Sequence, residues 1–248
     1  MIEISKRIIS TFGKTNAHFR LITEGDRVLV GLSGGKDSLL LATLLARLQR
    51  HAPFSFEFKA LTVDYGIGED FGYLSEYCAQ NAIPHEIFRT NIMEVLEEKR
   101  RENSSYCSFC SRMRRGALYS KALEGGFNKL ALGHHLDDAA ESFFMNFSYN
   151  GAVRSMPPIY RADNNLLVVR PLIWLRERQI VDFVKKNELQ TPLCNCPARH
   201  DKPPYARAAT KQMLQRIEAE IPDFFVSLKS AFMRIHAGSF MDEKFLEH

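Results

Sequence analysis

A glycine-rich turn between two apolar runs constrains the fold of this chain more than any other sequence feature. Residues 28–42 read VLVGLSGGKDSLLLA, so a strand-like run leads through two glycines into a helix-like run. A strand followed at once by a helix is the first half of a βαβ unit, and such units build parallel sheets. The turn therefore predicts an α/β protein.

The same alternation continues along the chain. Strand-like apolar runs occur at residues 27–32, 56–64, 85–89, 129–134 and 166–170. Helical periodicity predicts helices at residues 2–20, 37–50, 69–81, 91–99, 112–124, 175–187, 206–221 and 224–236. Alternating strands and helices predict a doubly wound parallel sheet of about five strands with helices on both faces.

Length and composition agree with one such domain. We expect a single domain over residues 1–245, its core at about 22–190, with an N-terminal helix and a C-terminal helical extension. Residues 246–248, LEH, look like the start of an expression tag. The apolar runs are too short to span a bilayer and no signal-peptide pattern opens the chain, so we expect a cytoplasmic protein.

The residues of the turn are suited to binding phosphate. Gly34 and Gly35 permit positive φ and let backbone N–H groups approach an anion, at a helix N-terminus that itself favours negative charge. Lys36 supplies a positive charge, and the hydroxyls of Ser33 and Ser38 add hydrogen-bond donors. The turn therefore predicts a phosphate cradle.

Asp37 is unexpected in a site for an anion. Its carboxylate is explained if it holds Mg²⁺ that bridges the phosphates. The alternative is a helix N-cap, which explains Asp37 but not the neighbouring Lys36. The turn is not a Walker A loop, because Val30 stands where that pattern needs glycine and Asp37 where it needs Ser or Thr.

The cysteines indicate metal or redox chemistry. Cys107 and Cys110 have the spacing that places two sulfurs on one metal, and Cys194 and Cys196 form a second pair. Three or four thiolates suit zinc or an iron–sulfur cluster, and paired catalytic cysteines without metal remain an alternative. Cys78 lies in a helical pattern and is interpreted as a core residue.

Residues 99–121 form a basic segment. They contain seven Lys or Arg residues and one acid, with aromatic residues between them. This pattern favours binding to a phosphate backbone and unstacked bases, with Arg112, Arg114 and Arg115 as the phosphate contacts. The alternative is an ordinary solvated helix face.

The motif SGGKDS resembles the PP-loop of the ATP pyrophosphatase superfamily, whose members cleave ATP between the α and β phosphates. The resemblance implies that Lys36 and the backbone amides of the turn bind the pyrophosphate group and that Asp37 binds Mg²⁺. It also implies that Val63 and Asp64, in LTVDYG, approach the adenosine. The motif LALGHHLDD would close the site with the residues Gly133, His134, Asp137 and Asp138.

That last motif has two further interpretations. His134 and Asp138 are four residues apart, so on a helix they would share a face and could bind a metal ion. The aspartates could instead cap the start of a helix.

Over roughly residues 5–240 the chain resembles the tRNA 2-thiocytidine synthetase (TtcA) family. The resemblance lies in CSFCSRMRRGALY, KLALGHHLDDAAESFF, GAVRSMPPIY and VVRPLIWLRERQI. It implies a [4Fe–4S] cluster held by three cysteines, of which Cys107 and Cys110 are the first two. The third would begin a second C-x-x-C, but this chain has C-x-C there. We expect Cys194 as the third ligand, with Cys196 as the alternative.

The resemblance also implies a reaction. ATP adenylates the 2-oxo group of an anticodon-loop cytidine in tRNA, and sulfur at the open iron then replaces it. Asp37, Cys107, Cys110 and Cys194 would be the catalytic residues. The partners would be tRNA, a sulfur donor (a cysteine desulfurase or sulfide) and a second copy of the chain in a homodimer.

Other functions remain open at this point. The chain could be a PP-loop tRNA-uridine thiolase or another adenylating synthetase. It could also be a zinc-stabilised protein that binds tRNA or nucleotide without turnover, or a metal-free sulfur carrier that uses Cys107 and Cys110.

Overall fold

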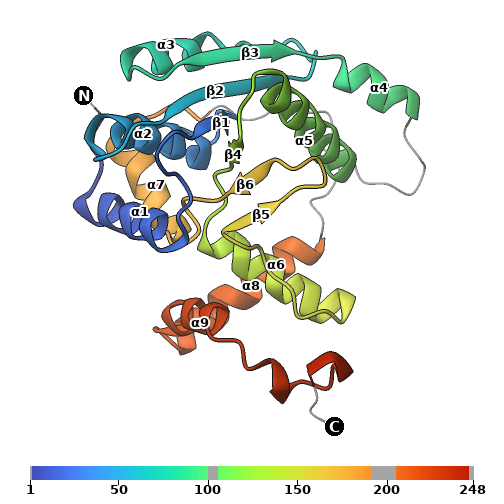
Figure 1. Cartoon of the computed structure of the whole chain (residues 1–248). Helices are drawn as coiled ribbons and strands as arrows, with labels where there is room; N and C mark the ends of the chain where they lie inside the picture. The colour runs from blue at the N-terminus through green and yellow to red at the C-terminus, as the bar shows by residue number, and fades with distance from the viewer. Residues whose placement is uncertain (1, 100–105, 192–204, 246–248) are drawn as a thin grey trace. The chain divides into compact units, whose positions relative to one another are not determined.

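The predicted strands form one sheet in the computed structural model, which describes residues 2–99, 106–191 and 205–245 (Figure 1). The six strands lie in the order β3-β2-β1-β4-β6-β5. Their bounds are β1 Arg27–Gly31, β2 Glu57–Asp64, β3 His85–Arg89, β4 Lys129–Ala131, β5 Ile159–Arg161 and β6 Leu167–Val169. All neighbours except β5 and β6 pair in parallel, so the predicted parallel sheet is confirmed.

The sixth strand, β5, was not predicted. It pairs antiparallel with β6, with Tyr160 opposite Val168, and forms a hairpin at the edge of the sheet. Asn165, in the hairpin turn, has a φ of 67°. The residues of β5, IYR, are not part of a longer apolar run such as those that contain the equally short β4 and β6.

The helices of the first part of the chain follow the predicted order. They are α1 Lys6–Phe19, α2 Lys36–His51, α3 Gly72–Gln80, α4 Ile92–Lys99, α5 Tyr106–Glu124, α6 Leu136–Asn150 and α7 Glu177–Lys186. Helix α5 begins at Tyr106 and not at residue 112, and α6 was foreseen only at its start.

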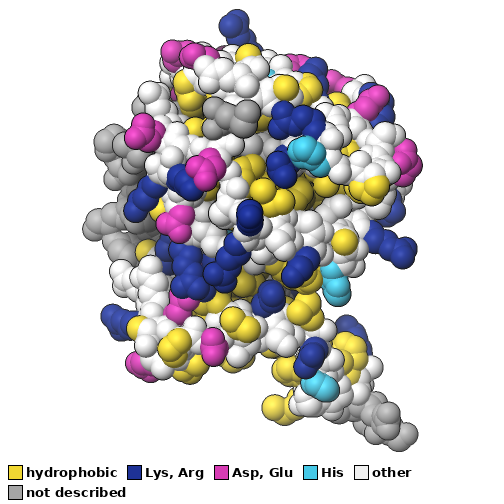
Figure 2. All heavy atoms as spheres, turned by 90° about the vertical axis from the view of Figure 1, so that its left-hand side faces the viewer, with side chains coloured by type: hydrophobic (Ala, Val, Ile, Leu, Met, Phe, Trp, Pro, Cys, Tyr) yellow, Lys and Arg dark blue, Asp and Glu magenta, His cyan; other side chains and the backbone are white. Residues whose placement is uncertain are grey.

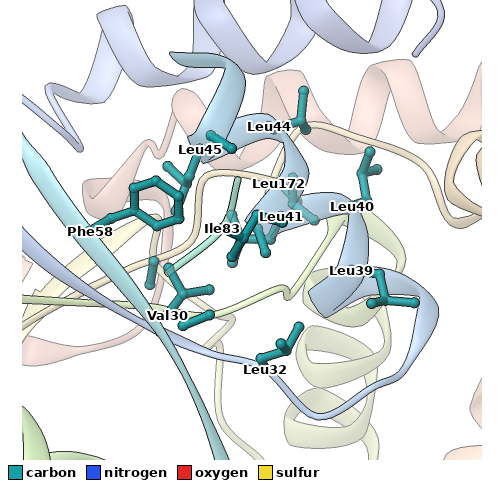
Figure 3. Close-up of a cluster of buried hydrophobic side chains, with 14 of the residues drawn as sticks. Val30, Leu32, Leu39, Leu40, Leu41, Leu44, Leu45, Phe58, Ile83 and Leu172 are labelled. Carbon is teal, nitrogen blue, oxygen red and sulfur yellow. The ribbon is translucent and has the colours of Figure 1, made fainter. Parts of the chain in front are cut away.

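One face of the sheet is covered by α1, α2, α3 and α7. Five leucines of α2 are buried there against Val30, Leu32 and Phe58 of β1, its exit and β2 (Figure 3). These leucines are Leu39, Leu40, Leu41, Leu44 and Leu45. Nearly every residue from 38 to 46 is buried, so α2 is an interior helix whose position is determined by packing.

The opposite face of the sheet is covered by α4 and α5. Leu29 of β1 and Leu61 of β2 point to this side and pack with Leu118 and Ala122 of α5. Successive strand residues point to opposite faces, so Val28 and Val30 serve one core and Leu29 the other. Helices on both faces confirm the doubly wound arrangement.

The chain divides into two compact units. Unit 1 contains Met1–Ala139 and Met156–Pro203, and unit 2 contains Ala140–Ser155 and Pro204–His248. The described part of unit 2 holds most of α6, with α8 Tyr205–Glu220, α9 Phe224–Met233 and the short 3-10 helices η2 Ala237–Ser239 and η3 Glu243–Phe245. The predicted extent of a single domain stays a prediction. No helix in the described ranges is long and apolar enough to cross a membrane.

A buried ion pair joins the amino-terminal ends of β1 and β4. Lys129 Nζ lies 2.6 Å from Asp26 Oδ2, and the two side chains are 6% and 7% exposed. Lys129 also donates to the carbonyl of Leu21, and Asp26 accepts from Thr23 and Asn128. Burial raises the pKa of Asp26, but the hydrogen bonds, chiefly those from Lys129 and Thr23, together lower the pKa by more than burial raises it. The pKa of Asp26 therefore lies below its usual value.

Replacing one partner of this pair should destabilise the chain strongly. Lys129→Met leaves the Asp26 carboxylate buried without its cation, and we expect the free energy of unfolding in urea to fall by about 3–5 kcal/mol. The control is Glu57→Gln, which breaks the exposed Arg27–Glu57 pair of β1 and β2 and should cost at most about 1 kcal/mol. Equal losses in the two variants would contradict this assignment.

Candidate functional site

The glycine-rich turn joins β1 to α2 at the carboxyl edge of the sheet, where α/β proteins bind their ligands. Gly34 has a φ of +78°, as expected. A Cβ atom on Gly34 would lie only 2.2 Å from the hydroxyl oxygen of Tyr73, so a larger residue would have to displace the Tyr73 side chain and would also be strained by the positive φ. Gly35 is different: its φ is −74° and it is the N-cap of α2, so the expectation of positive φ is wrong for Gly35.

The two serines of the turn have different environments. Ser38 is buried, its Oγ donates to the carbonyl of Gly35 at 2.9 Å, and it accepts from the backbone N–H of Ser33 at 3.2 Å. Ser33 is exposed, and its Oγ lies 3.2 Å from Ser38 Oγ. Ser38 therefore holds the turn together, whereas the Ser33 hydroxyl can reach a ligand.

Lys36 lies between two carboxylates. Its Nζ is 3.0 Å from Asp37 Oδ2 and 3.3 Å from Glu177 Oε1 at the start of α7. Burial lowers the pKa of Lys36, but Asp37 and Glu177 raise it by more, so the ammonium group stays charged. Glu177 could not be foreseen, because nothing in the sequence links it to a turn about 140 residues earlier.

The two carboxylate oxygens of Asp37 differ in their hydrogen bonding. Oδ2 accepts from Lys36, whereas Oδ1 is buried and has no hydrogen-bond partner within the described residues. Burial raises the pKa of Asp37 and Asp138 adds to that, while Lys36 and His135 act in the opposite direction; the pKa ends above its usual value. Because Gly35 is the N-cap of α2, the alternative of Asp37 as the helix cap is wrong.

The loop after β4 packs directly on this turn. A Cβ atom on Gly133 would lie 3.1 Å from the carbonyl carbon and oxygen of Asp37, so a larger residue would require the backbone at Asp37 to shift by a few tenths of an ångström. The same loop places His135 in the interior, 3% exposed, with Nε2 3.3 Å from Asp138 Oδ2 and 3.6 Å from Asp37 Oδ1. From the sequence we expected His134 and not His135 at the site, although the two adjacent histidines were a signal for both.

The two aspartates in the first turn of α6 both accept hydrogen bonds from neighbouring segments. Asp138 Oδ2 accepts the backbone N–H of His135 at 3.0 Å, which caps the start of α6 and confirms the capping alternative for Asp138. Asp137 accepts from Arg176 Nε at 3.1 Å and from the backbone N–H of Glu177 at 2.7 Å, so it ties α6 to α7. In the described ranges no three His, Cys, Asp or Glu side chains are placed to hold a metal ion, so the metal alternative gains no support.

The end of β2 lies beside the turn, because β2 is the neighbour of β1 in the sheet. Val63 is buried, and Asp64 Oδ1 accepts the backbone N–H of Gly66 at 2.9 Å. The carbonyl of Asp64 accepts from Thr90, which follows β3. The proposed contact of Val63 and Asp64 with adenosine stays a prediction.

Only one of the candidate cluster ligands has a described side chain. Cys110 is half-buried on α5 and packs against the core on that face of the sheet. The backbone of Cys107 belongs to α5 too, one helical turn earlier, whereas Cys194 and Cys196 lie outside the described residues. Cys78 is a core residue, as predicted, and burial raises the pKa of its thiol to about 11.

The three arginines of the basic segment lie on α5 as well. Arg112 and Arg115 are exposed, and Arg114 is half-buried. Their helical setting is compatible with both interpretations, a solvated face and a surface for phosphates.

One cavity of unit 1 lies away from this site. It has a volume of about 690 Å³ and is lined by α1, the loop before β1 and the carboxyl-terminal half of α2, including Phe12, Leu44 and Leu48. Helix α2 has 16 residues, so its two ends are separated by about 24 Å. Figure 2 shows the side of the molecule on which α1 and α2 lie. Hydrophobic side chains on this face are surrounded by Lys, Arg and His side chains.

Comparisons with known proteins show which family the chain resembles over most of its length. A family profile described as a PP-loop domain matches residues 4–191. A tRNA-cytidine(32) 2-sulfurtransferase of Pelobacter propionicus is 39% identical over 98% of this chain and 91% of its own length. One of Legionella pneumophila is 36% identical over 98% of this chain and 86% of its own length.

The fold is also found among solved structures. The U34-tRNA thiolase NcsA from Methanococcus maripaludis, solved with its [4Fe-4S] cluster, superposes with a TM-score of 0.73. The match covers 91% of this chain and 77% of that protein, at 24% identity. At this identity the likeness concerns the fold.

Removing the charge of Asp37 should stabilise the chain. Because the pKa of Asp37 lies above its usual 3.8, the folded state binds this proton more tightly than the unfolded state, and stability falls as the pH rises from that value. We expect Asp37→Asn to have a higher free energy of unfolding than the wild type at neutral pH, by a margin that shrinks as the pH falls towards 3.8.

The free energy of unfolding is measured by urea denaturation at neutral pH and near pH 3.8. Asp182→Asn, at an exposed position of α7, is the matched control and should change stability little at either pH. A loss of stability in Asp37→Asn at neutral pH would show that the ionised carboxylate is stabilising, contrary to this expectation.

Proposed function

Because the chain belongs to the PP-loop family of tRNA-cytidine(32) 2-sulfurtransferases, we propose that it adenylates the 2-oxo group of an anticodon-loop cytidine in tRNA and replaces that oxygen with sulfur. Membership makes the chain a transferase that thiolates tRNA with ATP. The observation that carries the finer proposal is the turn at residues 33–38, with a charged lysine and an unpaired carboxylate oxygen at the carboxyl edge of the sheet.

The turn supplies the groups that bind ATP. In the described structure the ammonium of Lys36 is neutralised by Asp37 and Glu177, so phosphate oxygens of ATP would replace or join these partners. The N-terminus of α2 and the Ser33 hydroxyl add hydrogen-bond donors to the same anion. Together they hold the pyrophosphate leaving group while the α-phosphate is attacked by the cytidine oxygen.

Asp37 fits Mg²⁺. Its Oδ1 is buried without a hydrogen-bond partner in the described part of the chain, which is the state of an oxygen suited to a cation. Mg²⁺ is usually bound by one or two carboxylates together with substrate phosphates, so a single well-placed aspartate beside the turn is sufficient. Bound there, Mg²⁺ would neutralise charge on the departing pyrophosphate.

The cysteines fit a [4Fe–4S] cluster. We propose Cys107, Cys110 and Cys194 as its ligands, with Cys196 as the alternative to Cys194. Support comes from α5, which places the backbone of Cys107 and Cys110 one helical turn apart, and from the thiolate chemistry that such clusters require. Held by three thiolates, the cluster would supply one open coordination position for the incoming sulfur.

The same helix also supports a surface for tRNA. Arg112, Arg114 and Arg115 follow Cys110 directly on α5, so phosphate contacts made by these arginines would bring the substrate next to the cysteines. The residues proposed for the nucleotide side of the site are Gly133, His134, Asp138, Val63 and Asp64.

The sulfur donor, the homodimer and the cytoplasmic location stay predictions. Most of the exposed large hydrophobic side chains among the described residues belong to unit 2, including Val226, Ile235 and Met241, and this supports a partner for that unit.

Iron analysis and tRNA mass spectrometry test the cluster together with the reaction. Purified without oxygen, the chain should contain about four iron and four acid-labile sulfide per monomer and should convert cytidine to 2-thiocytidine only with ATP. Cys194→Ser should lose the iron and the thiolation, whereas Cys196→Ser, the matched control two residues away, should keep both.

Several results would contradict these assignments. A colourless protein with stoichiometric zinc would overturn the cluster, and retention of cluster and activity in Cys194→Ser would overturn that ligand. Sulfur found in uridine and not in cytidine would overturn the substrate. Lys36→Met should abolish thiolation while leaving the iron content unchanged, which separates the nucleotide site from the cluster.

The basic helix gives a second prediction. Replacing Arg112, Arg114 and Arg115 together by glutamine should weaken tRNA binding and reduce the dependence of log Kd on log salt by about 0.7–0.9 for each phosphate that is no longer bound. Binding isotherms at several salt concentrations measure this. Arg50→Gln, at the exposed far end of α2, is the control and should leave the slope unchanged; an unchanged slope in the triple variant would favour a merely solvated face.

A further inference from the structure

The hairpin of β5 and β6 holds an arginine in one orientation. Arg170 directly follows β6 and is 8% exposed. Its Nη1 donates to the carbonyl of Pro157 at 2.6 Å, and its backbone N–H donates to the carbonyl of Pro158 at 2.8 Å. Its guanidinium carbon lies 5.0 Å from the centre of the Tyr160 ring, within the range of a cation–π contact. These contacts leave the guanidinium little freedom.

The guanidinium edge that carries Nε faces His134. Arg170 Nε donates to Nδ1 of His134 at 3.3 Å. A guanidinium has only donors, so Nδ1 must offer a lone pair and the proton of the neutral imidazole must be on Nε2. In a doubly protonated ring, the Nδ1–H would point at the Nε–H of Arg170.

The positive charge around Arg170 also disfavours a second proton on His134. In the described ranges no carboxylate forms an ion pair with Arg170, and Arg115 adds a second positive charge nearby. Tyr160 and Tyr119 are joined by their hydroxyls at 3.0 Å, and burial together with Tyr160 raises the pKa of Tyr119 to about 12. The Tyr119 hydroxyl therefore stays neutral and does not offset the cation beside His134.

We propose that Arg170 is a positioning residue that holds His134 as the neutral tautomer protonated at Nε2. His134 then acts as a hydrogen-bond donor, and its Nδ1 can neither take up a proton nor bind a metal ion. Only the identity of the group that accepts the hydrogen bond from Nε2 of His134 rests on the proposed function. Within the nucleotide site this acceptor would be an oxygen of the nucleotide or of the adenylated base.

A purely structural role for Arg170 makes a different prediction. If the arginine only fastened the hairpin, its loss would affect stability but would not determine which nitrogen of His134 carries the proton. The tautomer of His134 separates the two roles, and it can be read without any activity assay.

Long-range ¹H–¹⁵N NMR of the full chain with ¹⁵N-labelled histidine makes this measurement. The His134 signals are assigned by their loss in His134→Gln. In the wild type we expect Nε2 to show the shift of a protonated nitrogen and Nδ1 that of an unprotonated one. In Arg170→Met both signals should move towards the average of the two tautomers. Arg161→Met is the matched control, because Arg161 lies on the same hairpin, is exposed and donates to Asn165; it should leave the pattern unchanged.

Three results would overturn the proposal. They are a proton on Nδ1 of His134 in the wild type, a doubly protonated ring at neutral pH, and an unchanged pattern in Arg170→Met. If Arg170→Met does not fold, the wild-type spectrum decides alone. The NMR result stands whether or not the chain thiolates cytidine, so failure here and failure of the proposed function are distinguishable.

Discussion

Burial of α2 against the sheet is the interaction on which the site depends. Five leucines of this helix are almost completely buried, and each buried leucine contributes about 1.5–3 kcal/mol. The helix therefore cannot shift or turn without losing much of the core. Its first residues are Lys36 and Asp37, so apolar packing fixes where the charges of the turn lie. Gly133 adds a second constraint, because it brings the loop after β4 against the backbone of Asp37.

The charges at the site are balanced unevenly. Lys36 has two carboxylate partners. One of them, Glu177, lies within reach of Lys36 because Asp137 accepts the backbone N–H of Glu177 at the start of α7. Asp37, in contrast, keeps one buried oxygen without a hydrogen bond in the described residues, at a cost to stability. Such a residue is expected where a ligand completes the coordination, and natural proteins concentrate these local conflicts at their functional sites.

The periodic elements could be predicted from the sequence, and the short or distant ones could not. The positions of the five parallel strands and of most long helices followed from local apolar patterns, whereas α6 was expected only at its start. Strand β5 lacks the longer apolar run in which the equally short β4 and β6 stand, and α5 begins at Tyr106, before the expected start at residue 112. The role expected for Gly34 was correct because it is local, whereas Gly35 proved to be a helix cap.

The sequence alone determined the kind of chemistry, because SGGKDS is contiguous and its glycines, lysine and aspartate act within one turn. It also determined the family, since the matching motifs span nearly the whole chain. Only the tertiary structure decided which distant residues complete the site. Glu177 reaches Lys36, and Arg170 reaches His134, because sheet order and hairpin pairing bring together residues that are far apart in the chain. No local pattern encodes such contacts, which depend on how the packed elements are arranged in space.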